Sequence, residues 1–219
     1  MGQKVHPKIF RIGTVFTWDS KWFARGMEYT NRLREDILLK KFLKKELKSA
    51  GVARIEIERT PNAITVLISS ARPGVIIGRQ GSGIEDLKKK IKKIFFGSSK
   101  ISLMVSVSEV EQPNLNAQLV SQGMIEELEK RMPYRRVLKQ AIDRVQKAGA
   151  RGVKVMISGR LNGAEIANSE MLTWGSVPLH TIRAYIDYAR GTARTMAGAV
   201  GVKVWIYRGE VFEEKARKK

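Results

Sequence analysis

Hydrophobic positions in the first half of the chain recur with two different periods. A helix is expected over residues 31–49, where apolar residues at helical spacing alternate with lysines. Its apolar positions are Leu33, Ile37, Phe42, Leu43 and Leu47. Residues 54–59 and 64–68 instead alternate between apolar and polar side chains around a turn signal at 60–62, which predicts a β-hairpin. Strict alternation over residues 101–108 predicts a third strand.

Two shorter helices are predicted between the hairpin and the third strand, and they meet at a pair of glycines. Ile76 and Ile77 precede the pair, and apolar residues follow it at helical spacing. Ser82 and Glu85 are expected to form a capping box at the start of the second helix. The order helix, strand, strand, helix, loop, helix, strand predicts an α+β unit with a three-stranded mixed sheet and helices on one face.

The glycine pair lies in the tetrapeptide Gly78-Arg79-Gln80-Gly81. Because glycine lacks a Cβ, a sugar-phosphate chain can lie directly against the backbone N–H groups of such a loop. The GXXG spacing resembles the KH module, which holds single-stranded nucleic acid. All four residues are therefore candidate RNA-binding residues. The alternative is an ordinary turn, whereas nucleotide-binding phosphate loops are excluded because their glycine spacing differs.

The second half of the chain predicts another α+β domain. Helices are expected over residues 115–132 and 134–148, separated at Pro133, and strands over 152–158, 182–189 and 201–207. Residues 164–170 are expected to form a short helical piece. Arg160, in the glycine-bounded loop 159–163, either faces a phosphate or merely belongs to a turn.

The helix at 134–148 has two contrasting faces when it is projected at 100° per residue. Its apolar stripe consists of Val137, Leu138, Ala141, Ile142, Val145 and Ala148. Arg135, Arg136 and Lys139 fall together on the far side. Long cations on a rigid helix can follow a phosphate backbone without reading its bases. The alternative is a solvated face in which Asp143 pairs with Lys139.

The first 30 residues show no regular period and combine aromatic with basic side chains. They are expected to form an extended arm, with Lys4, Lys8 and Arg11 as candidate contacts to nucleic acid. Its aromatic residues Trp18, Trp22 and Phe23 are expected to pack on the domain that follows. The expected organisation is an arm at 1–30, a KH-like domain at 31–110, a linker at 111–114, a second domain at 115–209 and a basic tail at 210–219.

Charge indicates the class of partner. The 219 residues include 41 Lys and Arg against 21 Asp and Glu, which gives a formal net charge of +20. Such an excess favours a polyanionic partner. No apolar run is long enough to span a bilayer. The chain has no cysteine and only two histidines, His6 and His180, so neither a zinc site nor a catalytic triad is expected. We therefore expect no enzyme, no metal, no cofactor, no small-molecule substrate and no membrane partner.

Several collinear blocks resemble the bacterial-type small-subunit ribosomal proteins numbered three, a family with a type II KH domain. The blocks are residues 1–7, 18–23, 71–78, 158–167, 177–181 and 201–206. Four positions depart from the family pattern: Asn162 replaces glycine, Asn168 and Ser176 replace arginine, and Tyr185 replaces an acidic residue. Because asparagine tolerates left-handed backbone, Asn162 is expected to preserve its turn. The lost arginines put individual RNA contacts in doubt rather than the fold.

The resemblance implies a protein of the small-subunit head that binds 16S-type ribosomal RNA. It implies proteins numbered four and five as neighbours around the channel through which messenger RNA enters, and contacts with proteins ten and fourteen. It assigns Arg135, Arg136 and Lys139 to the cations that passively help to unwind messenger RNA. The expected location is the ribosome, in the cytoplasm or in an organelle with a bacterial-type ribosome. The alternative is a free-standing KH-domain regulator that binds RNA off the ribosome.

Overall fold

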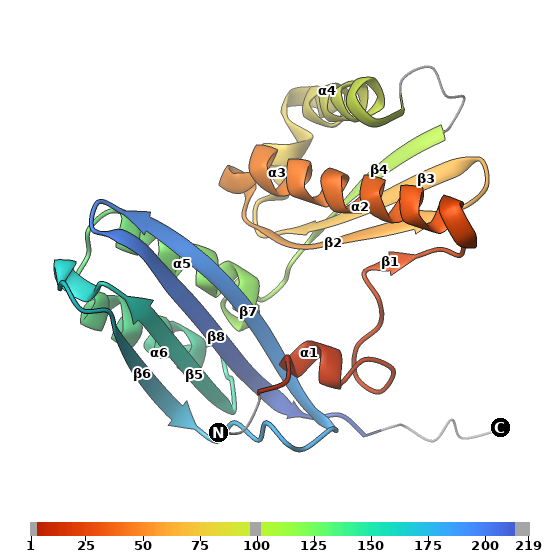
Figure 1. Ribbon diagram of the computed structural model, residues 1–219. Coiled ribbons are helices and arrows are strands. Elements are labelled where there is room, and N and C mark those ends of the chain that lie inside the picture. The colour runs from red at the N-terminus through yellow and green to blue at the C-terminus, as the bar shows by residue number, and fades with distance from the viewer. Residues whose placement is uncertain (1–3, 97–101, 213–219) are drawn as a thin grey trace. The chain divides into compact units, whose positions relative to one another are not determined.

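The computed structural model describes residues 4–96 and 102–212, which fall into two compact units (Figure 1). The first unit runs from Trp18 to Glu111, and the second combines the residues up to Thr17 with those from Gln112 onward. The segment expected to be one arm is therefore shared between the units. Most of the expected basic tail, from residue 213, lies outside the described residues.

The first unit is a mixed sheet with helices, as predicted. Its strand order is β1-β2-β3-β4, in which β2 and β3 are antiparallel while β3 and β4 are parallel. The elements are β1 (Ser20–Lys21), α2 (Gly26–Glu46), β2 (Val52–Arg59), β3 (Ala63–Ser70), α3 (Pro73–Ile77), α4 (Ser82–Ile91) and β4 (Ser102–Glu109). The two-residue strand β1, which pairs in parallel with β2, is an addition to the three predicted strands.

Helix α2 covers the sheet with a different stripe from the one expected (Figure 1). The buried positions are Asp36, Leu39 and Leu43, and Leu47 continues the stripe just beyond the helix. Leu33 and Ile37, two of the apolar positions at helical spacing, are 38% and 58% exposed and lie outside this buried stripe. The reason is the buried carboxylate of Asp36, which accepts hydrogen bonds from Trp22 Nε1 at 2.7 Å and Arg59 Nε at 2.8 Å. These contacts orient α2 with Asp36 inward.

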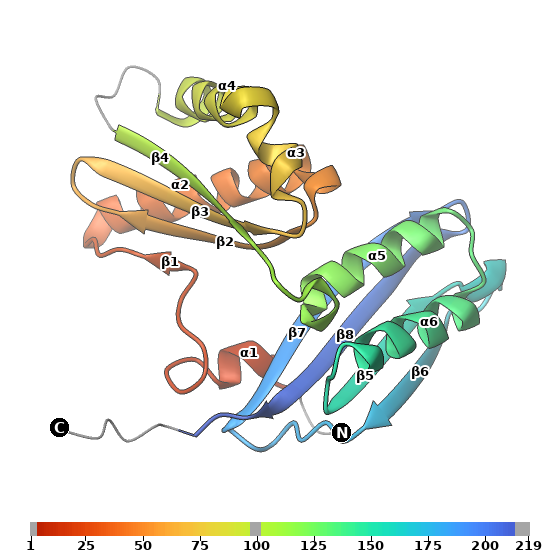
Figure 2. The ribbon, with the colours of Figure 1, turned by 180° about the vertical axis from the view of Figure 1, so that it is seen from behind.

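The second unit is an antiparallel sheet with strand order β6-β5-β8-β7. Helices α5 and α6 lie across one face of it (Figure 2). The elements are α1 (Pro7–Phe10), α5 (Ala117–Glu129), α6 (Tyr134–Lys147), β5 (Gly152–Gly159), β6 (Asn168–Gly175), β7 (Ala184–Thr195) and β8 (Gly198–Glu210). Apolar residues of α5, α6 and the strands form one core between helices and sheet.

The helical piece expected over residues 164–170 is absent. Strand β6 begins at Asn168 instead, and Glu170 pairs with Ile157 of β5. Local composition favoured a helix, but the open edge of β5 supplies backbone partners that a short helix lacks. β7 and β8 also run farther than predicted and form a long hairpin, which places residues 194–198 at its tip.

Candidate nucleic-acid interface

The GXXG loop is a tight turn between α3 and α4. Gly78 and Gly81 have φ values of +69° and +84°, and Gln80 also has a left-handed backbone with φ +53°. A Cβ at Gly78 would lie 2.9 Å from the backbone nitrogen of Gly83, so a side chain cannot be accommodated there without movement. Arg79 and Gln80 are exposed. The loop therefore presents a cation and an amide beside glycine backbone.

The start of α4 differs from the expected capping box. The N-cap residue is Gly81 and has no side chain to cap with, while Ser82 Oγ donates a hydrogen bond to the Arg79 carbonyl at 2.9 Å. Ser82 thus stabilises the GXXG turn itself. Gly83 is a structural residue that sequence reasoning missed, since its Cβ would lie 2.6 Å from the Ile76 carbonyl oxygen. The presence of a third glycine two residues after the GXXG motif could have indicated this close approach between the two helices.

Helix α6 has the two faces predicted for it. Val137, Leu138, Ala141, Ile142 and Val145 are buried against the sheet. Arg135, Arg136 and Lys139 are exposed. A buried stripe fixes the rotation of the helix, so the cationic face is held toward solvent by the core rather than by mobile loops.

Arg135 is oriented by its neighbours. Its Nη2 lies 3.3 Å from Glu170 Oε1, and its guanidinium carbon lies 5.7 Å from the centroid of the Tyr134 ring. The hydrogen bond with Tyr134 and then the contact with Glu170 raise the pKa of Arg135. Its side chain is still 75% exposed.

Arg136 and Lys139 have no carboxylate partner among the described residues, and the alternative pair of Lys139 with Asp143 does not form in this structure. Uncompensated cations on a rigid helix suit a polyanion better than an internal salt bridge would.

Arg11 is not available to RNA. It is completely buried, and its terminal nitrogens donate hydrogen bonds to the carbonyls of Pro7 at 3.0 Å, Leu179 at 2.8 Å and Thr181 at 2.9 Å. Burial lowers the pKa of Arg11. The predicted RNA contact of Arg11 is wrong, because a buried guanidinium that already binds carbonyls cannot reach a phosphate. Its role is to fasten the N-terminal segment to the second unit.

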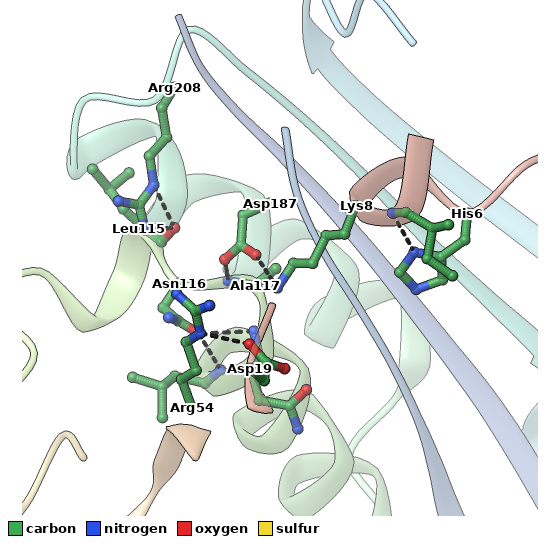
Figure 3. A network of polar contacts seen from close by, with 12 residues as sticks. His6, Lys8, Asp19, Arg54, Leu115, Asn116, Ala117, Asp187 and Arg208 are labelled. Atoms are coloured by element: carbon green, nitrogen blue, oxygen red, sulfur yellow. Dashed lines mark hydrogen bonds and ion pairs between the residues drawn. The ribbon is translucent and has the colours of Figure 1, made fainter. Parts of the chain in front are cut away.

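The remaining candidate cations differ in their exposure and in whether another group of the protein already binds them. Lys4 is exposed, whereas Lys8 Nζ lies 2.7 Å from Asp187 Oδ1, so its charge is already compensated (Figure 3). Arg160 is exposed and its Nε donates to the Ala164 carbonyl at 2.9 Å, which closes its own loop. In that loop Asn162 has φ +54°, the left-handed backbone expected where the family usually has glycine.

The aromatic residues of the expected arm behave differently from one another. Trp22 is half-buried and contacts Tyr29 as well as Asp36, as expected for packing on the following domain. Trp18 and Phe23 are 65% and 75% exposed, so the expectation that they pack there was wrong. Their neighbours on the chain form the short strand β1, which positions the backbone without burying these two rings.

The described residues also bear on metal and membrane binding. Within 4–96 and 102–212, no group of three or more His, Cys, Asp or Glu side chains lies close enough to hold a metal ion. The same part of the chain contains no helix with the length and apolar character required to cross a membrane.

Comparison with known proteins gives matches over both units. The KH domain model matches residues 38–115, and the model described as ribosomal protein S3, C-terminal domain, matches residues 124–206. A protein of Caldicellulosiruptor saccharolyticus is 47% identical over 98% of this chain and 96% of its own length. A protein of Desulforudis audaxviator is 44% identical over 99% of this chain and 97% of its own length. A protein of Streptococcus pneumoniae is 47% identical over 100% of this chain and 99% of its own length.

Each of these three relatives bears the name small ribosomal subunit protein uS3. The name denotes a ribosomal protein rather than an enzyme, which agrees with the expectation that this chain has no catalytic activity. The resemblance predicted from the sequence is confirmed over nearly the full length of the chain.

Proposed function

The chain belongs to the uS3 family of small-subunit ribosomal proteins, and from that premise we propose that it is a constituent of the small-subunit head that binds 16S-type ribosomal RNA and helps to form the messenger RNA entrance channel. The formal net charge of +20 supports a polyanionic partner. A KH unit with an exposed Arg79 in its GXXG loop adds a backbone-binding element of the kind used for single-stranded RNA.

One observation carries the messenger RNA part of this proposal. The core-facing stripe of α6 holds Arg135, Arg136 and Lys139 on an exposed face, and two of these cations lack a carboxylate partner among the described residues. Cations fixed in this way bind the phosphates of an RNA whatever its base sequence, and a channel that admits every message requires this. They would hold separated strands apart while translocation supplies the work, so the unwinding is passive.

The proposed partners follow from the family. Around the channel these are messenger RNA and the small-subunit proteins numbered four and five, and elsewhere in the head the proteins numbered ten and fourteen. The proposed location is the ribosome, in the cytoplasm or in an organelle.

Sedimentation tests the ribosomal assignment. We expect the full-length chain to run with small subunits through a gradient at moderate salt. Recovery mainly in low-mass fractions would instead favour the free-standing KH regulator.

Translation of two messages tests the channel assignment. We expect Arg135→Ala, Arg136→Ala and Lys139→Ala together to slow translation through a stable hairpin and to leave an unstructured message nearly unaffected. Lys147→Ala, at the last residue of the same helix, is the matched control. Equal slowing of both messages by the triple variant would show that the three cations do not act on strand separation.

A further inference from the structure

A hollow of about 440 Å³ lies in the second unit beside the start of α6. Its lining residues come from three separate segments: five lie within 128–134 at the turn between α5 and α6, four are residues 160–163 after β5, and five are residues 194–197 and Val200 at the tip of the β7–β8 hairpin. The volume falls within the roughly 300–1,000 Å³ of small-molecule sites. Neither the GXXG loop nor the exposed face of α6 includes this hollow.

The lining carries an excess of positive charge. Arg131, Arg160 and Arg194 contribute to it, whereas Glu129 is its one acidic residue. The Glu129 carboxylate already accepts a hydrogen bond from the Arg194 backbone nitrogen at 3.3 Å. Neither Arg131 nor Arg160 forms an ion pair within the described part of the chain. An anionic group is therefore the complement of this rim.

Buried apolar side chains also line part of the hollow, and a site for a bare anion would not need them. Leu128, Leu161 and Val200 are buried residues of the core that also line the hollow, and Tyr134 adds an aromatic ring. Aromatic and apolar side chains beside arginine planes are the surroundings in which unstacked RNA bases are held. The combination of cationic rim and apolar floor matches a nucleotide, which carries an anionic phosphate and a base with flat aromatic faces that stack on apolar side chains.

The rim combines one residue with a constrained backbone, Arg131, and one exposed flexible side chain, Met196. Arg131 has φ +62°, a left-handed backbone that arginine rarely adopts, and its guanidinium donates to Met196 Sδ at 2.7 Å. Met196 is nevertheless 87% exposed at the hairpin tip. A flexible thioether side chain in that position can move to cover a bound base.

We propose that this hollow, called here the arginine pocket (Arg131, Arg160 and Arg194 with Tyr134 and Met196), receives one unstacked nucleotide of an RNA strand that follows α6. Tyr134 lines the pocket and directly precedes Arg135 and Arg136, so a strand on the cationic face of α6 passes its mouth. The proposal rests on the proposed function of α6. It adds that the strand is gripped by a base as well as by its phosphates.

The first test uses a ten-nucleotide single-stranded RNA with 2-aminopurine at its centre, titrated with the full-length chain. Ala197 lines the pocket and is half-buried, so Ala197→Phe fills the pocket without adding charge. We expect this variant to bind about fivefold more weakly or worse and to lose the change in 2-aminopurine fluorescence. Ala199→Phe, at an exposed position outside the lining, is the control and should behave as the wild type.

A second variant tests the pocket independently, in case Ala197→Phe fails to fold. Arg131→Asn removes a rim cation with a residue that tolerates the left-handed backbone, and the same loss of fluorescence change is expected. Wild-type affinity and fluorescence in both variants would overturn the pocket. The triple alanine variant of α6 distinguishes the proposed RNA binding by α6 from the proposed arginine pocket. It should weaken RNA binding, while the change in 2-aminopurine fluorescence at saturation persists. Unchanged affinity of the triple variant would refute the α6 proposal instead.

The source of the nucleotide is decided in assembled small subunits. 4-Thiouridine is placed either in the messenger RNA close to the channel or in the ribosomal RNA, and cross-links to peptides with Tyr134 or Met196 are mapped by mass spectrometry. A cross-link from either RNA supports the pocket and identifies its ligand. Absence of a cross-link from both would overturn it.

Discussion

Lys8 Nζ lies 2.7 Å from Oδ1 of Asp187, and the other oxygen of this carboxylate accepts a hydrogen bond from the Ala117 backbone nitrogen at 2.7 Å (Figure 3). Asp187 is on β7, Ala117 is the first residue of α5, and Lys8 belongs to α1. A single buried carboxylate thus joins the N-terminal segment, the sheet and the start of a helix. This contact and the carbonyl contacts of Arg11 help to hold the N-terminal segment in the second unit.

Asp187→Ala should destabilise the second unit by about 2–4 kcal/mol, because it leaves both the Lys8 ammonium and the Ala117 N–H without their acceptor. Lys8→Met should cost less, since its side chain is 38% exposed and water can replace part of the interaction. Urea unfolding measures both changes. Asp143→Ala, at an exposed site on α6, is the control and should change stability by less than about 0.5 kcal/mol. Equal effects of the two aspartate substitutions would contradict this role.

His6 should make attachment of the N-terminal segment dependent on pH. Its ring packs edge-on against Tyr188 with centroids 4.8 Å apart, and its Nδ1 accepts a hydrogen bond from the Ile9 backbone nitrogen. Burial, and then repulsion from Lys8 and Arg190, lower the pKa of His6 from 6.5. A lowered pKa favours the neutral ring in the folded state, so this stability is present above pH 6.5 and is lost as the pH falls through the folded-state pKa.

Urea midpoints measured from about pH 8 to about pH 5 test this expectation. His6→Gln, which stays neutral, should flatten part of the fall in stability on the acid side. His180→Gln serves as the control, because His180 is the other histidine of the chain. An identical pH profile for His6→Gln and the wild type would show that His6 does not couple the segment to pH.

The GXXG loop offers a separate test of RNA binding. Arg79→Asp with Gln80→Asp should weaken binding of single-stranded RNA and reduce its salt dependence, because a phosphate contact is replaced by repulsion. Aspartate tolerates the left-handed backbone of position 80, so unfolding is not expected. Filter binding at several salt concentrations gives both quantities, and circular dichroism verifies the fold. Unchanged affinity at every salt concentration would mean that this loop does not contact the RNA.

Local sequence patterns correctly predicted the strands with alternating apolar residues and the helix with a continuous apolar stripe. The alternation in residues 54–59 and 101–108 corresponds to β2 and β4, and the stripe on α6 is buried as projected. Periodicity alone could not show which face of α2 is buried, since apolar residues occur around much of that helix. The choice is made by Asp36, whose partners Trp22 and Arg59 are distant in sequence.

Long-range contacts also decide which candidate cations are free. In sequence, Arg11 looks like Lys4, a basic residue in an aperiodic segment. Its burial depends on carbonyls near residues 178–181, which are about 170 positions away. The arginine pocket escaped sequence reasoning for the same reason, because its three segments meet only in the folded unit.

Two helical glycines provide a matched pair that tests the packing of the GXXG motif. A Cβ at Gly83 in α4 would lie 2.6 Å from the Ile76 carbonyl oxygen of α3, whereas a Cβ at Gly123 in α5 meets nothing within 4 Å. Gly83→Ala should therefore push the two helices apart and destabilise the first unit by about 1–3 kcal/mol. Gly123→Ala should stabilise α5 by about 0.5–1 kcal/mol, because alanine loses less conformational entropy in a helix.

Hydrogen exchange read by mass spectrometry assigns each effect to its own unit. Faster exchange is expected in peptides of α3 and α4 for Gly83→Ala, and slower exchange in α5 for Gly123→Ala. RNA binding should weaken only in Gly83→Ala, since the GXXG turn lies between the helices that this Cβ displaces. If Gly83→Ala kept both its exchange pattern and its RNA affinity, the close approach of α3 and α4 would not be what holds the loop in its binding shape.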